Sequence, residues 1–339
     1  MSRTRLAAEP IFGHAAVGVA PSWHCDAKCS HCFIPAKERR RDGFDAEVSK
    51  ASLFGLPEGV RWVIFTGGEP FLHPDRLLDL ARAVSESGRS ASVVTNGEWA
   101  LEWEQAERML SEAWQSGLKG ITVSVDEYHR PAVPLDVVSR LLKRAREIGF
   151  IINVVGVGKK GREKIAQLEA DGLALERPNE NNLSDLENVG VASSLTSDRV
   201  RKLDLNGCRA AMEPLIGPDG SVYACCTYQL FNIQNSVLLR GNVLKRPVGE
   251  ILEEAGRDYL LAAMAAVGPG GLLKLLGRSV PRKVVSPCSL CLSLLNDDAV
   301  VAELRDRIGS DKQLRKELVG WHMIYHATCR PDGAEGRGI

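Results

Sequence analysis

Three cysteines stand within eight residues near the start of the chain, and no other feature limits its folding as strongly. Cys25, Cys29 and Cys32 are separated by three and by two residues. A loop this short aims three thiolates at one metal centre, and thiolates favour zinc, copper(I) or iron–sulfur clusters. A structural zinc site normally has four protein ligands, whereas a [4Fe–4S] cluster held by three cysteines keeps one iron open to another ligand. A zinc half-site and a group of buried thiols are the alternatives.

The nine cysteines of the chain fall into two groups, because none stands between Cys32 and Cys208. The N-terminal segment lacks the apolar stretch of a secretory signal, which predicts a cytoplasmic location. In a large chain of this kind, grouped cysteines indicate metal binding or catalysis rather than disulfides. The gap therefore predicts two separate metal-binding regions.

The charge of the chain excludes some classes of partner. Lysine plus arginine and aspartate plus glutamate both number 43, so the formal net charge is zero. Without a basic field the chain is not expected to bind nucleic acid or an anionic membrane surface. Its most apolar runs are too short to span a bilayer. A length of 339 residues suits one large domain and a smaller one.

In the first half of the chain, short apolar runs alternate with amphipathic helical patterns. The apolar runs predict strands at 15–20, 61–66, 91–95, 121–125, 150–155 and 187–191. The periodic patterns predict helices at 74–87, 99–116, 134–148 and 159–169. This alternation is typical of βαβ units around a parallel sheet. Six such units predict an α/β fold, a partial (β/α)6 TIM-like barrel.

Polar residues follow four consecutive predicted strands. The cysteine loop follows the first strand, Gly67-Gly68-Glu69-Pro70 the second, Asn96-Gly97 the third, and Ser124 and Asp126 end the fourth. Functional residues of such barrels lie at the carboxyl ends of the strands. We therefore expect one site at this rim.

The pattern changes near residue 206. Pro218-Asp219-Gly220 stands between two apolar pairs and predicts a β-hairpin of 215–216 with 222–223. A helix is predicted over 250–266, and two more over 297–328 with Gly309-Ser310 between them. The resulting division is an N-terminal segment (1–14), the barrel (15–203), a small C-terminal α+β extension (204–296) and a helical tail (297–339).

The cysteine spacing reproduces the Cys-x3-Cys-x2-Cys signature of the radical S-adenosylmethionine (radical SAM) enzymes, and the chain resembles this family. The resemblance implies that Cys25, Cys29 and Cys32 bind a [4Fe–4S] cluster whose open iron chelates the amino and carboxylate groups of S-adenosylmethionine. In the family, an electron from the cluster cleaves this cofactor and forms a 5′-deoxyadenosyl radical.

The turn after the second predicted strand resembles a further motif of the family. Gly67, Gly68 and Glu69 match its Gly-Gly-Glu sequence, which implies a contact with the methionyl amino group of S-adenosylmethionine. Paired glycines let a backbone approach a ligand closely, and a carboxylate accepts hydrogen bonds from an ammonium. A turn with a solvated glutamate is the alternative.

Five other residues are assigned to the same cofactor by the resemblance. Ser124 and Asp126 match the polar pair that contacts the ribose hydroxyls, although a strand-end cap has the same sequence. Asn96 matches a Thr-Asn-Gly turn that lines the pocket. Arg130 is expected to pair with the methionyl carboxylate, or else to lie in solvent. His31 replaces the aromatic residue that commonly packs on the adenine, and it adds a titratable group there.

The second group of cysteines resembles the twitch and SPASM extensions of radical SAM enzymes, which bind an auxiliary [4Fe–4S] cluster. The implied ligands are Cys208, Cys225, Cys288 and Cys291. The full SPASM pattern is not met, since its last two positions are Asp297 and Val301. We therefore expect one auxiliary cluster, held by four thiolates in a closed site suited to electron transfer or structure. A four-cysteine zinc knuckle is the alternative.

Two cysteines remain outside both predicted clusters, Cys226 and Cys329. Radical epimerases need a hydrogen-atom donor that quenches the substrate radical from the opposite face, and a thiol can serve. Both residues are therefore candidate catalytic thiols, and inert thiols are the alternative.

The family resemblance implies a reaction class and a set of partners. An external electron donor of the flavodoxin or ferredoxin type reduces the enzyme, and the radical removes a hydrogen atom from the substrate. We expect maturation of a ribosomal peptide or another natural product by oxidation or cross-linking. Only 24 residues precede Cys25, so we expect no leader-binding domain fused there, and a separate leader-binding protein is compatible with this expectation. The alternatives are a sugar or aminocyclitol dehydrogenase or epimerase, and a non-catalytic scaffold that binds zinc.

Overall fold

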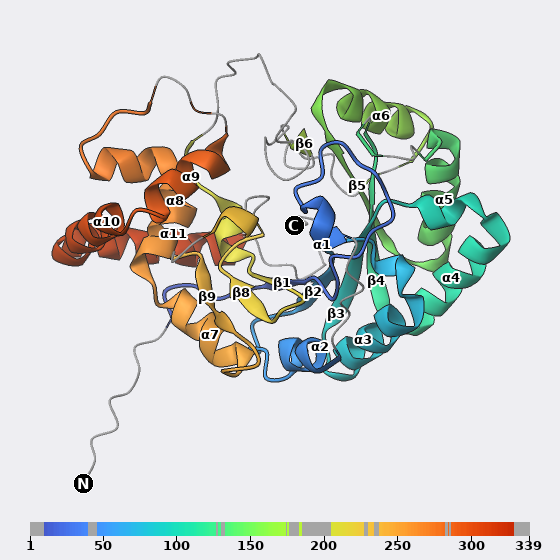
Figure 1. Cartoon of the computed structure of the whole chain (residues 1–339), viewed down its shortest axis with the longest axis horizontal. Helices are drawn as coiled ribbons and strands as arrows, with labels where there is room; N and C mark the ends of the chain where they lie inside the picture. Colours follow the sequence, from blue (N-terminus) through green and yellow to red (C-terminus); the bar gives the residue numbers. More distant parts are fainter. Residues whose placement is uncertain are drawn as a thin grey trace, which may run out of the picture.

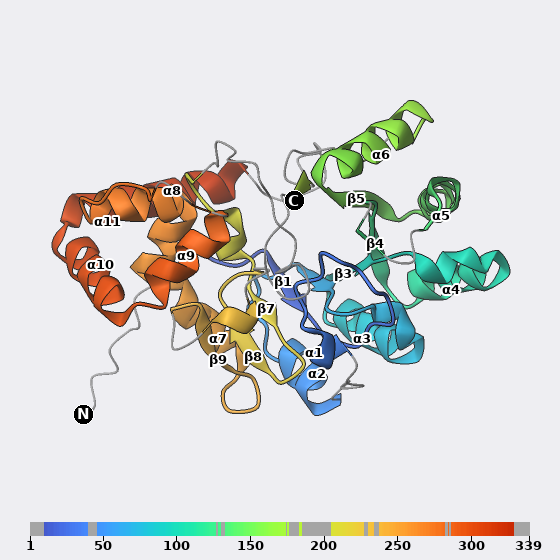
Figure 2. The same cartoon turned by 45° about the horizontal axis from the view of Figure 1, so that its top comes forward.

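One continuous sheet organises the molecule (Figure 1). The computed structural model of the chain describes residues 10–39, 46–126, 128–129, 133–173, 175, 183–184, 205–226, 230–233, 237–281, 284 and 286–328. Within these ranges nine strands follow the spatial order β6-β5-β4-β3-β2-β1-β7-β8-β9. The sheet curves, and α1 (Ala36–Arg39) lies on its concave side (Figures 1 and 2).

The first six strands run parallel, as the alternating pattern predicts. They are β1 (Ala16–Val19), β2 (Trp62–Phe65), β3 (Ser90–Thr95), β4 (Leu118–Ser124), β5 (Ile151–Val157) and β6 (Leu183–Ser184). The sixth strand expected at 187–191 lies outside the described residues, and β6 stands just before it. An α/β fold built on a partial parallel barrel is therefore confirmed.

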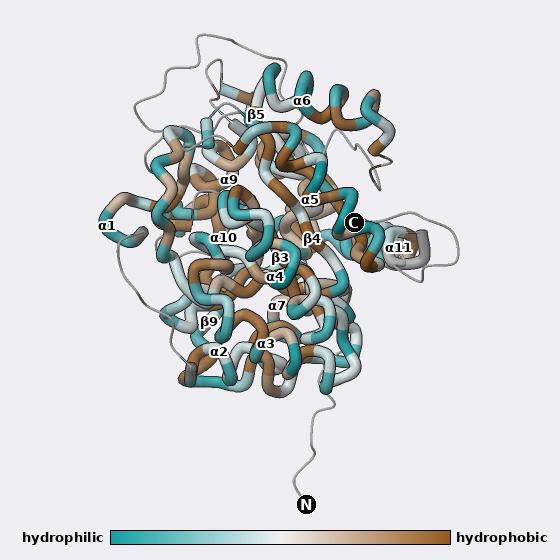
Figure 3. The backbone as a smooth tube through the Cα atoms, turned by 90° about the vertical axis from the view of Figure 1, so that its right-hand side faces the viewer, coloured by the Kyte–Doolittle hydropathy of each residue, from teal (hydrophilic) through white to brown (hydrophobic). Residues whose placement is uncertain are grey.

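Helices cover the convex side of this sheet (Figure 1). They are α2 (Ala46–Leu53), α3 (Pro74–Glu86), α4 (Trp103–Gln115), α5 (Leu135–Ile148) and α6 (Gly158–Ala170). The short helix α1 (Ala36–Arg39) lies on the inner side instead. The tube view shows apolar and polar turns alternating along α6, as expected of a helix with one buried face (Figure 3). The helix expected at 99–116 begins instead as a 3-10 turn, η2 (Glu98–Leu101), because left-handed Gly97 redirects the chain before α4.

The predicted hairpin is present, and it extends the barrel sheet. Strand β7 (Leu215–Ile216) pairs with β8 (Ser221–Tyr223), which pairs with β9 (Leu239–Asn242), all antiparallel. Strand β7 also pairs in parallel with β1, where Gly18 lies opposite Leu215. A Cβ atom on Gly18 would lie 2.8 Å from the Leu215 side chain, so this glycine gives room for the junction.

The chain after β9 is helical. It forms α7 (Val248–Gly256), α8 (Tyr259–Leu275), α9 (Pro287–Leu295), α10 (Asp298–Ser310) and α11 (Lys312–Thr328). The single helix expected at 250–266 is wrong, because Asp258 begins a new helix there. Its carboxylate accepts a hydrogen bond from the Leu260 amide at 3.0 Å and pairs with Arg240 and Arg305. The two helices expected at 297–328 are confirmed, but the break between them is at Asp311, because Gly309 and Ser310 belong to the last turn of α10.

Two separate apolar cores result from this arrangement. One lies between the barrel sheet and its outer helices and includes Val63, Phe65 and Leu141, together with most of the buried face of α7. The other joins α8, α9, α10 and α11 with Phe12. A smaller cluster of Ala20, Leu215 and Leu230 lies at the junction of β1 with β7. Among the described residues, no helix is both long and apolar enough to cross a lipid bilayer.

We expect Gly161→Ala to destabilise the barrel. Gly161 of α6 packs on Gly156 of β5, and an added Cβ would lie 2.9 Å from the Gly156 backbone carbon. Backbone cannot yield as a side chain can, so the free energy of unfolding should fall by about 1 to 3 kcal/mol. Urea denaturation of the purified variant measures this change.

Gly309→Ala is the matched control, because Gly309 is also helical but an added Cβ there would meet nothing within 4 Å. Its free energy of unfolding should stay equal or rise by about 0.5 to 1 kcal/mol, since alanine favours helices. Equal responses of the two variants would contradict close packing between β5 and α6.

Candidate active site

A cavity of about 380 Å³ opens at the carboxyl ends of the barrel strands. Residues from the cysteine loop, from the ends of β2, β3, β4 and β5, and from the extension line it. The predicted residues among them are Cys25, Cys29, His31, Cys32, Gly67, Gly68, Asn96, Ser124, Asp126 and Cys226. Segments far apart in the sequence therefore meet at one rim, as the strand-end pattern predicts.

The three cysteines of the short loop share one wall of this cavity. Cys29 is buried, and Cys25 and Cys32 are half-buried. Burial, together with the charges of Glu69 and of the other two thiols, raises the pKa of Cys25 to about 12. Such thiols become thiolates only when a cation offsets their charge. Three soft ligands that need a cation fit a metal centre and, in this number, an iron–sulfur cluster.

The paired glycines hold the cysteine loop against the end of β2. The Gly68 amide donates to the Ser22 carbonyl at 3.0 Å, and the Glu69 amide donates to the His24 carbonyl at 2.9 Å. A Cβ atom on Gly68 would overlap the His24 carbonyl oxygen, and Gly67 has a φ of 115°. Glycine is thus required here for contact between two protein segments, apart from any ligand.

Glu69 is held by the protein and does not line the cavity. Its Oε1 accepts hydrogen bonds from the Thr95 hydroxyl at 2.8 Å and the Phe71 amide at 3.1 Å, and its Oε2 accepts from the Asn96 amide at 2.8 Å. Burial raises the pKa of Glu69 to about 7, although these three donors oppose the shift. The alternative of a solvated glutamate is wrong, since only 5% of the residue is exposed.

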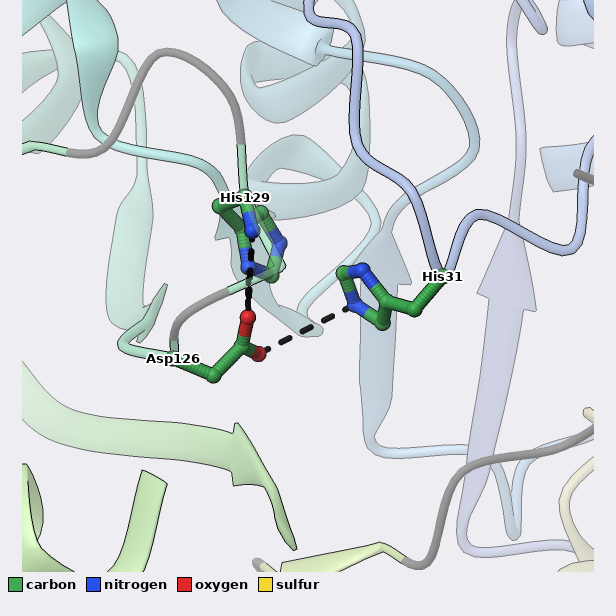
Figure 4. Close-up of side chains that lie close together, drawn as sticks. All are labelled: His31, Asp126 and His129. Atoms are coloured by element: carbon green, nitrogen blue, oxygen red, sulfur yellow. Dashed lines mark hydrogen bonds and ion pairs between the residues drawn. The ribbon is translucent and has the colours of Figure 1, made fainter. Parts of the chain in front are cut away.

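Asp126 lies between two histidines at the end of β4 (Figure 4). Its Oδ1 accepts from His129 Nδ1 at 2.8 Å, and its Oδ2 lies 3.8 Å from His31 Nε2. Burial disfavours the Asp126 carboxylate, but the hydrogen bond and charge of His129 outweigh it and hold its pKa below the usual value. Burial lowers the pKa of His31 to about 4, so this imidazole is neutral at pH 7.

The two histidines and Asp126 each offer one ligand atom within 4.8 Å of the others, a spacing that a metal ion accepts. Hydrogen bonds account for the same arrangement, because Asp126 also accepts from the amides of Tyr128 and His129. The group joins the cysteine loop to β4, and the Ser30 amide donates to the Tyr128 carbonyl at 3.1 Å beside it.

The remaining predicted cofactor residues differ in how far the structure describes them. Ser124 is half-buried on the cavity wall. Asn96 also lines the cavity, but its side-chain oxygen accepts from the Glu98 amide at 2.8 Å and so caps the turn that follows. Arg130 and Cys329 lie outside the described residues.

The second group of cysteines converges beside the cavity. Burial raises the pKa of Cys225 well above its usual value, and four other thiols near it add to the shift. These thiols are Cys291, Cys208, Cys226 and Cys288. Cys288 and Cys291 stand one turn apart on α9, and no disulfide joins any cysteines that the structure describes. Four of these five thiols are the predicted auxiliary ligands.

Cys226 lies on the cavity side of that group, near a carboxylate. Its Sγ is 3.7 Å from Glu213 Oε2, and both residues line the cavity with the first three cysteines. Solvent reaches Cys226 through the cavity, although protein surrounds it on most sides. Those surroundings and the Glu213 charge raise its pKa well above the usual value, so Cys226 is a thiol at neutral pH.

Three residues with contacts in the site were not predicted from the sequence: Thr95, His129 and Glu213. The Thr95 hydroxyl accepts hydrogen bonds from the Trp99 indole and the Gly97 amide, and it donates a hydrogen bond to Glu69. Its place in Thr95-Asn96-Gly97 is a usable signal. His129 follows Asp126 by three residues, a spacing that allows the observed contact. Glu213 reaches Cys226 only through the hairpin, and nothing local marks it.

Comparison with known proteins finds one matching family model and several relatives. Residues 21–170 match the Radical SAM superfamily. The chain is 21% identical over 291 residues to the "putative peptide biosynthesis protein YydG" of Bacillus subtilis (strain 168), which covers 80% of this chain and 89% of that one. It is 38% identical over 73 residues to the 7-carboxy-7-deazaguanine synthase of Methanospirillum hungatei JF-1, which covers 22% of this chain and 30% of that one.

Two solved structures share the fold. They are Streptococcus suis SuiB bound to the precursor peptide SuiA and SuiB bound to S-adenosylmethionine, each with a TM-score of 0.52 and 17% identity. Each alignment covers 71% of this chain, and the chain spans 65% and 66% of the two SuiB chains, slightly less than two thirds of their length.

The raised pKa of Glu69 predicts a dependence of stability on pH. The folded protein keeps the Glu69 proton up to about pH 7, whereas a glutamate in the unfolded chain loses it near its ordinary value of 4.5. The folded state therefore binds more protons between these values, and stability falls by about 2 to 3 kcal/mol as pH rises through this window.

Urea denaturation of the metal-free protein at pH 4.5 and pH 7.5 gives the change in the free energy of unfolding between these pH values. The contribution of Glu69 is this change in wild type minus the same change in Glu69→Gln. The difference isolates Glu69, because His31 contributes an opposite slope in both proteins: its lowered folded pKa gives stability that is lost as pH falls. A pH dependence unchanged in Glu69→Gln would contradict a protonated Glu69.

We expect Gly68→Ala to displace the cysteine loop and prevent metal binding there. After anaerobic reconstitution, wild type should hold about eight irons per chain if both cysteine groups bind a [4Fe–4S] cluster, and the variant about four. Gly13→Ala is the control, since an added Cβ would meet nothing within 4 Å there. Full iron content in Gly68→Ala, or zinc in place of iron in wild type, would refute the expectation.

Proposed function

Since this chain carries a radical SAM domain at residues 21–170, we propose that it is a peptide maturase that inverts the configuration of an α-carbon in its substrate. The observation that carries the proposal is the position of Cys226, a protonated thiol in the same cavity as Cys25, Cys29 and Cys32. The peptide substrate is supported by the relatives, one named a putative peptide biosynthesis protein and one solved with a precursor peptide.

The proposed cofactors are a [4Fe–4S] cluster on the three loop cysteines and S-adenosylmethionine. When bound, they supply a 5′-deoxyadenosyl radical that removes a hydrogen atom from an unactivated C–H bond. The chain's own residues would bind the cofactor and orient it. Gly67 and Gly68 are proposed to lie near the methionyl end of S-adenosylmethionine, and Glu69 is proposed to act there through the residues that hold it. Arg130 is the predicted partner of the methionyl carboxylate.

The nucleoside end is proposed for the opposite wall. Ser124 and Asp126 are the predicted ribose contacts, and Asn96 lines the same pocket. His31 offers a neutral imidazole face to the adenine, since its pKa is about 4. The Asp126 carboxylate beside His31 is already engaged by His129, so it positions both rings.

Cys226 is proposed as the hydrogen-atom donor. A carbon-centred radical left on the α-carbon is quenched by the Cys226 S–H, which forms a C–H bond on the opposite face and leaves a sulfur radical. Donation needs the thiol form, which the raised pKa of Cys226 maintains. One electron from an external donor of the flavodoxin or ferredoxin type and one proton restore the thiol. Glu213, 3.7 Å away, is placed to deliver that proton.

The atoms and electrons of this sequence balance. Each turnover consumes one S-adenosylmethionine, two electrons and one proton, and it yields methionine, 5′-deoxyadenosine and the inverted residue. One electron serves cofactor cleavage and the other restores Cys226. The mass of the peptide does not change in ordinary water.

A second candidate reaction is oxidation or cross-linking of the peptide. It is favoured by the convergence of Cys208, Cys225, Cys288 and Cys291, which would hold an auxiliary [4Fe–4S] cluster able to accept an electron from a substrate radical. In the epimerase the same cluster would pass an electron toward Cys226, its sequence neighbour. The two reactions differ in product mass, since oxidation removes two hydrogens.

The other predicted alternatives receive less support. A sugar or aminocyclitol substrate needs many hydrogen-bonding groups, and among the described cavity residues on the Cys226 side Glu213 is the one charged side chain. A non-catalytic zinc scaffold would not explain the match of residues 21–170 to the Radical SAM superfamily. A separate leader-binding partner and a cytoplasmic location stay predictions.

The decisive variant is Cys226→Ala, assayed with a pool of synthetic peptides in D2O. Solvent converts S–H to S–D, so wild type should add one deuterium per inverted residue, read as a one-dalton gain by mass spectrometry. Cys226→Ala should still form 5′-deoxyadenosine while deuterium incorporation falls at least about a hundredfold, as expected for removal of a group that acts in the reaction itself.

Cys291→Ala serves as the comparison, because it disturbs the neighbouring thiol group and leaves Cys226 in place. A two-dalton loss of peptide mass in wild type would favour oxidation instead. Deuterium incorporation that persists in Cys226→Ala would exclude this thiol as the donor.

A further inference from the structure

We propose that His31, Asp126 and His129 form a binding site for a divalent first-row metal ion, with zinc as the best match, in the enzyme that has no cofactor bound. These three residues are called the His–Asp site below. The metal site itself is inferred from the geometry of the three side chains. Its consequence for the cofactor rests on the proposed function, because His31 and Asp126 are proposed to contact the nucleoside end.

The three side chains converge from two segments of the chain (Figure 4). His31 belongs to the cysteine loop, whereas Asp126 and His129 follow β4. The Asp126 carboxylate lies 2.8 Å from His129 Nδ1 and 3.8 Å from His31 Nε2, and the three ligand atoms lie within 4.8 Å of one another. Two ligands of a tetrahedral zinc ion lie roughly 3.3 Å apart at bond lengths of about 2.0 to 2.2 Å. Small side-chain movements would therefore place the three atoms around one ion.

Hydrogen bonds explain the position of His129 but not that of His31. His129 Nδ1 is 2.8 Å from Asp126 Oδ1, which is a hydrogen-bond distance. His31 Nε2 is 3.8 Å from Asp126 Oδ2, which is too far for a hydrogen bond. His31 Nδ1 is buried and has no hydrogen-bond partner within the described part of the chain. Buried polar groups are normally paired, and an ion between His31 Nε2 and Asp126 would give this ring a partner.

The protein fixes the carboxylate before any ion arrives. Asp126 Oδ1 accepts from the amides of Tyr128 at 2.8 Å and His129 at 3.2 Å. Lys164 Nζ of α6 donates to the Asp126 carbonyl at 2.8 Å. The Ser30 amide donates to the Tyr128 carbonyl at 3.1 Å, which ties the cysteine loop to the same turn. Contacts of this kind orient metal ligands and raise their affinity for the ion.

The ligand set and its exposure suit a transition-metal ion that enters through the cavity. All three residues line the cavity, and the side chains of His31 and His129 are 15% and 17% exposed. Two imidazole nitrogens and one carboxylate oxygen suit zinc and its first-row neighbours, whereas magnesium and calcium prefer oxygen ligands alone. Three protein ligands leave the fourth position of a tetrahedral ion to water.

An ion in the His–Asp site and S-adenosylmethionine would exclude one another. The proposed partner of His31 is the adenine, and the proposed partner of Asp126 is the ribose. Both side chains would have to turn from the nucleoside toward the ion, and the ion would lie where the nucleoside end is proposed to bind. Zinc is therefore expected to compete with the cofactor.

The first test measures zinc binding to the anaerobically reconstituted enzyme without cofactor, in which iron fills the predicted cluster cysteines. Equilibrium dialysis against zinc, followed by elemental analysis of zinc and iron, gives the number of bound ions. Wild type should hold one zinc per chain more than His129→Asn, with unchanged iron. Zinc that only replaces iron would overturn the His–Asp site.

Two variants and a control separate metal binding from folding. In His129→Asn the amide still donates a hydrogen bond to Asp126 but does not bind zinc, and His31→Phe keeps a ring in the cysteine loop. Each should raise the zinc Kd at least about tenfold, the effect expected even for residues that only support a ligand. His73→Asn is the matched control, because His73 precedes α3 outside the cavity lining and asparagine is favoured there. Its zinc Kd should equal that of wild type.

The second test measures competition by dialysis of radiolabelled S-adenosylmethionine. Zinc at ten times its own Kd should raise the apparent Kd of the cofactor about elevenfold in wild type, the factor that simple competition gives. In His129→Asn the same zinc concentration should leave the cofactor Kd unchanged. His73→Asn should respond as wild type does.

The outcomes separate the metal site from the proposed function. Equal zinc binding by wild type, His129→Asn and His31→Phe would overturn the His–Asp site whatever the reaction. Zinc that is lost from both variants but does not alter the cofactor Kd of wild type would support the site and refute the proposed position of the nucleoside end. The same loss of zinc in an enzyme that binds no S-adenosylmethionine would support the site and refute the proposed function.

Discussion

The parallel pairing of β1 with β7 is the interaction on which the rest of the structure depends. Strand β1 delivers the cysteine loop, and β7 belongs to the hairpin that carries Glu213 and Cys226. Two hydrogen-bonded strands separated by almost 200 residues therefore bring the cysteine loop and Cys226 to one cavity. The pairing is possible because Gly18 has no side chain where Leu215 packs. A parallel barrel sheet and an antiparallel extension thus form one hydrogen-bonded unit, and the cavity lies along the line where they meet.

Local patterns explain what could be predicted. The Cys-x3-Cys-x2-Cys spacing, the buried strands and Pro218-Asp219-Gly220 each depend on a few neighbouring residues, and the structure has each where the sequence indicates it. The strand-end rule then gathers His31, Asn96, Ser124 and Asp126 at one rim without any knowledge of contacts. By contrast, the break at Asp258 could not be read from apolar periodicity, because it depends on arginines that approach from β9 and α10.

Long-range contacts explain what could not be predicted. Glu69 looks like a surface turn residue in sequence, yet Thr95 and Asn96 from the next strand close over it. The partnership of Cys226 with Glu213 depends on the hairpin returning beside β1, and the ring contact between Trp23 and Phe231 depends on the 3-10 turn Leu230–Asn232 lying beside the cysteine loop. The ionisation states of the site follow from the same contacts: near neutral pH Cys226 is protonated, Asp126 is ionised, His31 is uncharged, and Glu69, with a pKa of about 7, is partly protonated.

The shared sheet also bears on how the molecule can be divided. If the barrel were produced without the extension, β1 would become an edge strand with the apolar sequence Ala16-Val17-Gly18-Val19 and unpaired amide and carbonyl groups. Such an edge recruits other strands and promotes aggregation. The extension therefore protects the barrel from self-association, in addition to supplying cysteines. A barrel truncated before the extension is therefore expected to aggregate, so the chemistry of the two parts is better separated by point variants.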